Sequence, residues 1–254
     1  SKALALQGDK EVMAVLERKA EELSIPLSIA DPSNLKGIKS SLDRQSFRYG
    51  KYEDLTIHMV GRYQLENAML AVCAMEELVK AGFPVKEKDI YKGLSDAFWP
   101  GRFQVLAKNP LFIVDGAHNR DGAARLAQTI QFYFTNRRII YIIGILRDKE
   151  QEEILKAACP LAAQVFTVPT IGERGLSSYE LACTAKQYHG NVTSVDSIQE
   201  AVELAYLSAN KDTVIIAFGS LSYLGNLINI VKAASDKESR KKMGRDSHGK
   251  QRES

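Results

Sequence analysis

The second half of the chain alternates short apolar runs with amphipathic segments, and this rhythm limits the possible folds more than any other feature. Residues 139–143 and 214–218 are apolar at every position. A strand of this kind has apolar surroundings on both faces, which is typical of a parallel sheet covered by helices on both sides. We therefore predict an α/β domain with a mostly parallel, doubly wound, Rossmann-like sheet.

The rhythm begins after Trp99-Pro100-Gly101-Arg102 and continues to about residue 234. Apolar runs and helical spacing predict the individual elements. The expected strands are 104–107, 112–115, 139–144, 164–168, 192–195 and 214–219. The expected helices are 121–134, 149–158, 178–189, 198–208 and 221–234.

The first part of the chain has a mixed pattern. Helices are expected over 11–23, 63–81 and 86–97, and two short strands over 47–49 and 56–59. Residues 235–254 carry seven Lys/Arg against four Asp/Glu, a composition that favours a solvated, disordered tail. We therefore divide the chain into residues 1–102, 103–234 and a basic tail of 235–254.

Charge and composition exclude several classes of partner. The formal net charge is +3 and the tail alone contributes 7 − 4 = +3, so the rest is neutral and does not suggest nucleic-acid binding. The three cysteines, Cys73, Cys159 and Cys183, are far apart, as expected of structural thiols in a reducing cytosol. No apolar run is long enough to cross a membrane and no cluster has metal-ligand spacing. We expect a cytoplasmic protein without a membrane or nucleic-acid partner.

Polar residues follow the apolar strands, where parallel sheets bind ligands. Asp115-Gly116-Ala117-His118-Asn119 comes directly after residues 112–114. The Asp115 carboxylate could accept both ribose hydroxyls, and the His118 imidazole could reach the same ligand. The alternative is that Asp115 or Asn119 caps the next helix while Gly116 allows the turn.

Three other strand ends carry polar side chains. Residues 144–149 end in three consecutive charges, which could face a ligand or could be a helix cap with solvated neighbours. The loop 169–175 offers Thr170 and Arg174 to an anionic ligand, although an exposed loop arginine is often only solvated. Ser220 follows the last strand and could form part of an anion-binding nest.

Two residues outside these strand ends are also candidates. Arg102 lies at the predicted domain boundary, where its guanidinium could clamp a phosphate or form a structural salt bridge. Asn67 lies on the predicted helix 63–81, where its amide could read an adenine edge or simply face solvent.

Taken together, these segments resemble a known family. Residues 61–68 (Gly-Arg-Tyr-Gln-Leu-Glu-Asn-Ala), 99–104 (Trp-Pro-Gly-Arg-Phe-Gln) and 115–119, in this order and spacing, are similar to folylpolyglutamate synthase/dihydrofolate synthase of the Mur ligases. Residues 144–149 and 218–220 also look like that family, so the resemblance covers about residues 1–233. It implies that 103–234 is a Mur ligase C-terminal domain and that 1–102 is the remainder of a central ATP-binding domain.

The resemblance implies an ADP-forming acid–amino-acid ligase. ATP would phosphorylate the γ-carboxylate of a folate, or the carboxylate of dihydropteroate, and the amine of L-glutamate would displace the phosphate. Carried over to this sequence, Asn67 would read adenine, Arg102 would contact the phosphates as the catalytic cation, and Asp115 and His118 would hold the nucleoside. Thr170, Arg174 and Ser220 are candidates for substrate binding from their strand-end position alone.

In that family the P-loop, the Mg²⁺ ligands and a modified lysine lie N-terminal to the residue that matches Ser1. We therefore expect ATP and Mg²⁺ as cofactors, with no metal ligand in this chain. The chain alone should be a monomer that binds ATP weakly and turns nothing over. The alternatives are another Mur-type amino-acid ligase and a non-catalytic Rossmann-like binding module.

Overall fold

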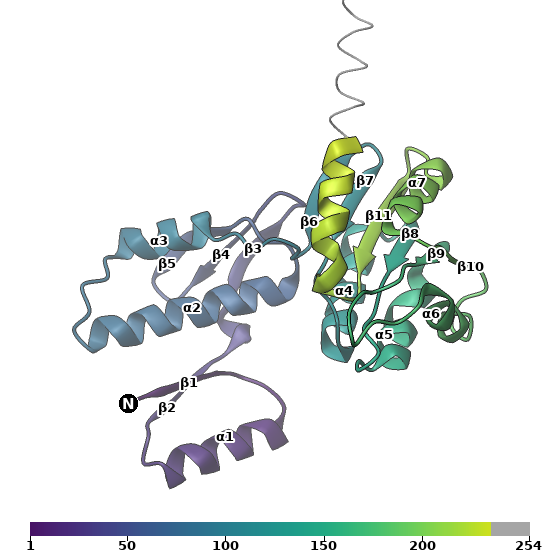
Figure 1. Cartoon of the computed structure of the whole chain (residues 1–254). Helices are drawn as coiled ribbons and strands as arrows, with labels where there is room; N and C mark the ends of the chain where they lie inside the picture. The colour runs from purple at the N-terminus through teal and green to yellow at the C-terminus, as the bar shows by residue number, and fades with distance from the viewer. Residues whose placement is uncertain (235–254) are drawn as a thin grey trace, which may run out of the picture. The chain divides into compact units, whose positions relative to one another are not determined.

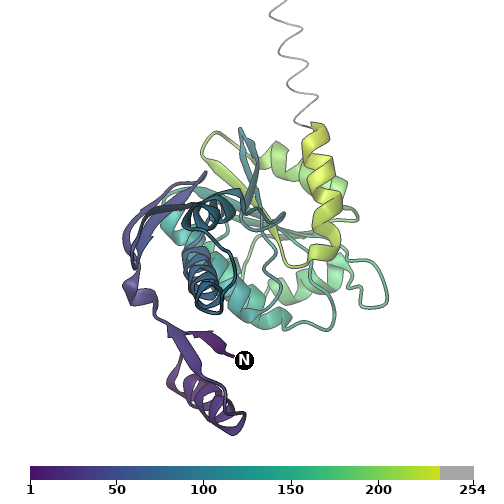
Figure 2. The ribbon, with the colours of Figure 1, turned by 90° about the vertical axis from the view of Figure 1, so that its left-hand side faces the viewer.

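The computed structural model describes residues 1–234, which fall into two compact units divided between Trp99 and Pro100 (Figures 1 and 2). The predicted basic tail, 235–254, lies outside the described residues.

The first unit contains two small sheets and three helices. Strands β1 (Ala3–Leu6) and β2 (Leu27–Ala30) pair in parallel and are connected by α1 (Lys10–Glu22). Strands β3 (Lys36–Ser40), β4 (Gln45–Tyr49) and β5 (Tyr52–Ile57) form an antiparallel sheet, followed by α2 (Arg62–Lys80) and α3 (Glu87–Asp96). The sequence predicted the three helices and the β4–β5 hairpin but not β2 or β3.

The core of this unit lies between the hairpin and α2. Phe47 and Leu55 are buried against Leu65 and Val72 of α2, and Ile90 of α3 joins the same cluster. The apolar residues of α2 recur at helical spacing, so one face of this helix packs while the other meets solvent.

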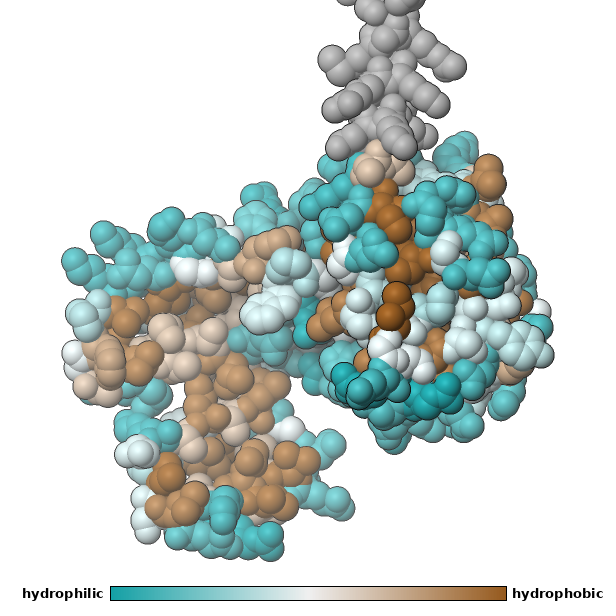
Figure 3. Space-filling model, viewed as in Figure 1, coloured by the Kyte–Doolittle hydropathy of each residue, from teal (hydrophilic) through white to brown (hydrophobic). Residues whose placement is uncertain are grey.

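Helix α1 buries only one edge of its apolar stripe. Met13 and Ala20 are buried, whereas Val12 and Val15 are each 54% exposed. In the space-filling view, apolar side chains gather at the surface around α1 and β1–β2 (Figure 3).

The second unit is an α/β domain around a six-stranded sheet. The strands are β6 (Gln104–Lys108), β7 (Leu111–Val114), β8 (Arg138–Ile143), β9 (Gln164–Thr167), β10 (Val192–Ser194) and β11 (Thr213–Phe218), in the order β10-β9-β8-β11-β7-β6. All neighbours pair in parallel except β6, which is antiparallel to β7. The prediction of a mostly parallel, helix-covered α/β sheet is confirmed.

Helices cover both faces of this sheet (Figures 1 and 2). One face packs against α7 (Ile198–Ser208) and a last helix over residues 221–234. Helices α4 (Arg120–Tyr133), α5 (Gln151–Ala158) and α6 (Ser178–Ala185) lie on the other face. The central strands β8 and β11 are buried almost throughout, which is why their sequences are apolar at nearly every position.

The chain order brings three strand ends together. From β7 the chain passes over the position of β11 to form β8, and β11 later inserts between β7 and β8. The carboxyl ends of β7, β8 and β11 are therefore neighbours at one edge, near the point where the strand order reverses. Such switch points are where open α/β sheets bind ligands.

The segments that follow β7, β8 and β11 are in close backbone contact at this edge of the sheet. Gly219 follows β11 with φ +115°, and a Cβ added there would lie 2.5 Å from the carbonyl oxygen of Gly144. The Gly219 N–H donates to the Ala117 oxygen at 2.9 Å, so residues after β7, β8 and β11 meet at this glycine. The Tyr223 hydroxyl also lies within hydrogen-bonding distance of the carbonyl oxygens of Ile142 (3.0 Å) and Phe218 (2.6 Å).

We predict that Gly219→Ala destabilises the second unit by about 3 kcal/mol or more, because both its φ and the Gly144 oxygen oppose a side chain. Gly225→Ala is the matched control, since Gly225 lies in the helix 221–234 with open space around it. There alanine should be neutral or stabilise by up to about 1 kcal/mol. Hydrogen exchange of the β8 and β11 amides measures the stability of the second unit in both variants. Equal stability of Gly219→Ala and Gly225→Ala would contradict the proposed constraint at Gly219.

Candidate functional site

Asp115 lies at the end of β7 and is 4% exposed. Its two carboxylate oxygens accept hydrogen bonds from the backbone N–H groups of Phe103 and Ala117, each at 2.8 Å. These two donors compensate for the burial of the carboxylate. Asp115 therefore ties residues 101–103 to the end of β7, where Gly101 and Phe103 both have positive φ.

Asn119, and not Asp115, caps the following helix. Its side-chain oxygen accepts from the Gly122 N–H at 2.8 Å at the start of α4. Of the two capping alternatives open from the sequence, the structure selects Asn119.

Arg102 lies on the turn that Asp115 holds. A Cβ added at Gly116 would lie 3.2 Å from Arg102 Nη1 and 2.9 Å from Leu221 Cδ2, so glycine at 116 leaves room for the guanidinium. Arg102 is half-buried, and among the described residues it has no ion pair or hydrogen-bond partner for its side chain. The guanidinium is therefore available to an anionic ligand.

A cavity of about 250 Å³ lies at the same edge of the sheet. It brings together three of the predicted site residues, His118, Arg174 and Ser220. The other lining residues are Leu146, Lys149, Gly219, Leu221 and Ser222. Lys149 was not singled out from the sequence, although it ends the charge run 147–149 that marked this strand end.

The polar groups of the cavity have defined orientations. His118 Nδ1 lies 2.8 Å from the Gly116 carbonyl oxygen. Because a carbonyl only accepts, Nδ1 carries a proton, and Nε2 is the ring nitrogen left for a ligand. The Ser220 hydroxyl lies 2.9 Å from that of Ser222 and accepts from the Ser222 N–H at 3.2 Å. Both serines lie where the helix 221–234 begins, a position that favours anions.

Thr170 and Arg174 have different surroundings, although they share one loop. Thr170 is 7% exposed; its hydroxyl accepts from the Leu176 N–H at 2.9 Å and donates to the Ile145 oxygen at 3.2 Å. This hydroxyl pins the loop after β9 to the segment after β8. Arg174 is exposed and its Nη1 lies 3.1 Å from Asp148 Oδ2.

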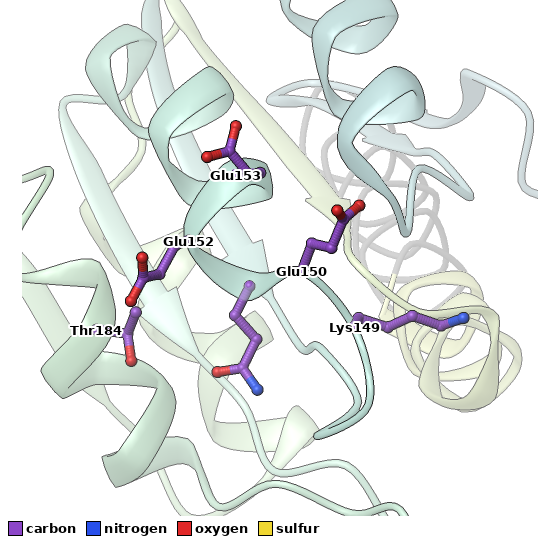
Figure 4. A pocket seen from close by; sticks show the side chains of 6 residues that line it. Lys149, Glu150, Glu152, Glu153 and Thr184 are labelled. Carbon is purple, nitrogen blue, oxygen red and sulfur yellow. The ribbon is translucent and has the colours of Figure 1, made fainter.

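A second, more acidic cavity of about 380 Å³ shares Lys149 with the first. Its other lining residues are Glu150, Gln151, Glu152, Glu153 and Thr184. Figure 4 shows that the Lys149 side chain points away from Glu152 and Glu153. Lys149 therefore lies at the boundary between an acidic cavity and one lined by basic and hydroxyl groups.

Asn67 belongs to the first unit. It is exposed on α2, and its Nδ2 donates to the buried Gln64 Oε1 at 3.1 Å. Its expected contact with adenine stays a prediction.

No helix in residues 1–234 is long and apolar enough to cross a membrane. The same residues contain no group of three or more His, Cys, Asp or Glu that could hold a metal ion.

The second unit has a recognised counterpart among known protein families. Residues 101–221 match the glutamate ligase domain of Mur ligases, so this unit is a Mur ligase glutamate ligase domain. The dihydrofolate synthase/folylpolyglutamate synthase of Bacillus subtilis is 35% identical over 106 residues, which cover 41% of this chain and 25% of that protein.

Solved structures of folylpolyglutamate synthases have the same fold as this chain. The folylpolyglutamate synthase of Thermotoga maritima is 30% identical with a TM-score of 0.70, covering 92% of this chain and 56% of that one. A bifunctional folylpolyglutamate synthase/dihydrofolate synthase with Mn, AMPPNP and L-glutamate bound is 23% identical with a TM-score of 0.71, and shares the fold.

The chain is a homologue of the folylpolyglutamate synthase/dihydrofolate synthase members of the Mur ligase family, as the resemblance predicted. It spans about a quarter of the length of the B. subtilis relative and just over half of the T. maritima structure.

We predict that Asp115→Ala destabilises the second unit by at least about 2 kcal/mol, because the buried N–H groups of Phe103 and Ala117 lose their acceptor. Asp115→Asn keeps one acceptor oxygen and should cost less. The control is Asp121→Ala, which removes an exposed ion pair with Arg125 and should change stability by less than about 1 kcal/mol. Urea unfolding measures all three, and an Asp115→Ala variant as stable as the control would rule out this anchoring role.

Proposed function

We propose that this chain is part of an ATP-dependent ligase that joins L-glutamate to a folate or to dihydropteroate, with release of ADP and phosphate. The observation that carries the proposal is the cavity with His118, Lys149, Arg174 and Ser220 at the carboxyl edge of a glutamate ligase domain. L-glutamate and AMPPNP bound to a solved homologue support it. In this proposal residues 1–102 are the remainder of a central ATP-binding domain.

The reaction proceeds in two displacements. A substrate carboxylate oxygen attacks the γ-phosphorus of ATP, the bond to the β-phosphate oxygen breaks, and ADP leaves. The amine nitrogen of L-glutamate then attacks the acyl-phosphate carbon, the carbon–oxygen bond to phosphate breaks, and the amine loses a proton. Negative charge accumulates on phosphate oxygens in both steps, so a fixed cation lowers both barriers.

Arg102 is the proposed phosphate-binding cation and so the catalytic residue. Its side chain has no competing ion pair in the described part of the chain, and the hydrogen bonds of Asp115 hold the turn that carries it. Asp115 thus positions this turn, and Thr170 positions the loop of Arg174. A carboxylate oxygen that accepts one N–H can accept a second hydrogen bond, so Asp115 also remains the proposed contact of the ribose hydroxyls and Thr170 a proposed substrate contact.

The remaining candidates can contact ligands directly. His118 offers Nε2 to the nucleoside, Arg174 and Ser220 face the cavity as substrate contacts, and Asn67 is the proposed adenine reader. The described residues offer no metal-ligand cluster. That the Mg²⁺ ligands lie outside this chain, and that the chain by itself does not ligate glutamate, are part of the proposal; ligation of glutamate by the isolated chain would contradict it.

A chimera tests the function. Residues 100–234 of this chain replace the matching part of T. maritima folylpolyglutamate synthase, and ATP-dependent incorporation of different amino acids into a folate is measured. We expect incorporation of L-glutamate in preference to other amino acids.

Within the chimera, Arg102→Ala should lower kcat by about 100-fold or more, as expected for loss of a charge-stabilising group. The control is Arg120→Ala, which removes an exposed arginine 3.6 Å from Glu153 and should leave kcat within about twofold. Preference for another amino acid would favour a different Mur-type ligase. A folded chimera that binds ATP without transferring any amino acid would favour a binding module.

A further inference from the structure

Arg102 lies between two residues with positive φ. Gly101 has φ +74° and Phe103 has φ +43°. Glycine adopts this conformation freely, whereas in phenylalanine the Cβ crowds the backbone. Among the described residues, Phe103 is the only non-glycine residue of the second unit with positive φ. Strain of this kind persists only where the surrounding contacts hold it, and such residues cluster at functional sites.

Phe103 joins two segments that are fixed by hydrogen bonds. On one side, its own N–H donates to Asp115 Oδ2 at 2.8 Å. The Gly101 N–H, at the start of the same turn, donates to Gln104 Oε1 at 2.9 Å. On the other side, the pairing of β6 with β7 begins at Gln104. Because both segments are fixed, the φ of Phe103 defines the angle between the turn that carries Arg102 and the sheet.

The Phe103 ring is buried among aromatic side chains at the end of α4. Phe103 is 2% exposed, and its ring centroid lies 6.4 Å from that of Phe134, with the two planes 14° apart. The Tyr133 ring centroid lies 6.3 Å from it on the same helix end. Aromatic pairs at such distances contribute more than the burial of their area alone. The packing of this ring therefore offsets the strain of the Phe103 backbone.

The position of Arg102 depends on this turn. Among the described residues its side chain has no ion pair or hydrogen bond, so in residues 1–234 no side-chain partner fixes the guanidinium. Its Nη1 lies where a Cβ on Gly116 would come within 3.2 Å. If Phe103 relaxed to negative φ, the turn would rotate against β6 and carry the guanidinium away from Gly116.

We propose that Phe103 is a positioning residue, which holds the Arg102 guanidinium in place through the packing of its ring against Phe134 and Tyr133. Phe103 is buried and does not itself contact a ligand. The use of this positioning in phosphoryl transfer rests on the proposed function. The rigidity of the turn does not rest on it, so the two are measured separately.

The rigidity is tested by ¹⁵N relaxation of the full chain. The variants Phe103→Leu and Phe134→Leu each remove one ring of the stacked pair. The matched control is Phe166→Leu, since Phe166 is also 2% exposed but belongs to the core that packs against α7. We expect the Arg102 amide to have an order parameter of about 0.85 in the wild-type chain and in the control, and below about 0.6 in Phe103→Leu. Phe134→Leu should lower it in the same direction. Unchanged amide shifts of β8 and β11 show that each variant is folded.

The use of this positioning in catalysis is tested in the chimera described above. Phe103→Leu should lower kcat about tenfold and leave the KM for ATP within about twofold, as expected when a group that acts in the transition state is misplaced. Phe166→Leu should leave kcat within about twofold. In an Arg102→Ala background, Phe103→Leu should lower kcat no further, because its effect passes through the guanidinium. A merely structural role would lower kcat by the same factor in both backgrounds.

The contrary outcomes separate this inference from the proposed function. If the Arg102 amide is as rigid in Phe103→Leu as in the wild-type chain, Phe103 does not hold the turn and the inference fails. If the amide becomes mobile while kcat is unchanged, or if the effects on kcat are additive, Phe103 does not act through Arg102, but the proposed function stands. If the unmodified chimera transfers no amino acid, the proposed function fails, and the order parameter alone decides whether Phe103 holds the turn.

Discussion

The contact of Gly219 with Gly144 is the constraint on which the rest of the site depends. Two strands that are distant in sequence end in glycines whose backbones approach more closely than any side chain would allow. Because Gly219 also donates to Ala117, the ends of β7, β8 and β11 converge there. The start of the last helix, with Ser220, is placed by the same contact.

Two kinds of polar interaction surround this convergence, and they differ in strength. Asp115 is buried with two backbone donors, so removing its carboxylate leaves unsatisfied groups in the interior. The Arg174–Asp148 pair has side chains that are 65% and 43% exposed, and such pairs contribute at most about 1 kcal/mol. The turn of Arg102 is therefore rigidly held, whereas Arg174 can exchange its partner at little cost.

The sequence was most informative where burial is complete on both faces. Strands such as β8 and β11 are recognisable because nearly every side chain in them is apolar. Strand β3, Lys-Gly-Ile-Lys-Ser, is exposed along its length, so its composition carries no strand signal. The reversed direction of β6 depends on a tertiary pairing that periodicity does not report.

The candidate site, like the fold, could be predicted from the sequence only in part. His118, Arg174 and Ser220, which were chosen for their strand-end position, line one cavity, because parallel strands end at a common edge. Asp115 and Thr170 are predicted ligand contacts that also bond backbone groups of Phe103 and Ile145, and these backbone partners appear only in the folded chain. Lys149 was passed over because a charge run has the same composition whether it is solvated or lines a cavity.

The central claim is that the cavity at the convergence of β7, β8 and β11 is a ligand site. The most direct measurement is a crystal structure of the chain grown with L-glutamate. We predict electron density for the amino acid between His118, Lys149 and Ser220. Density for L-glutamate elsewhere on residues 1–234, with only solvent in this cavity, would contradict the account.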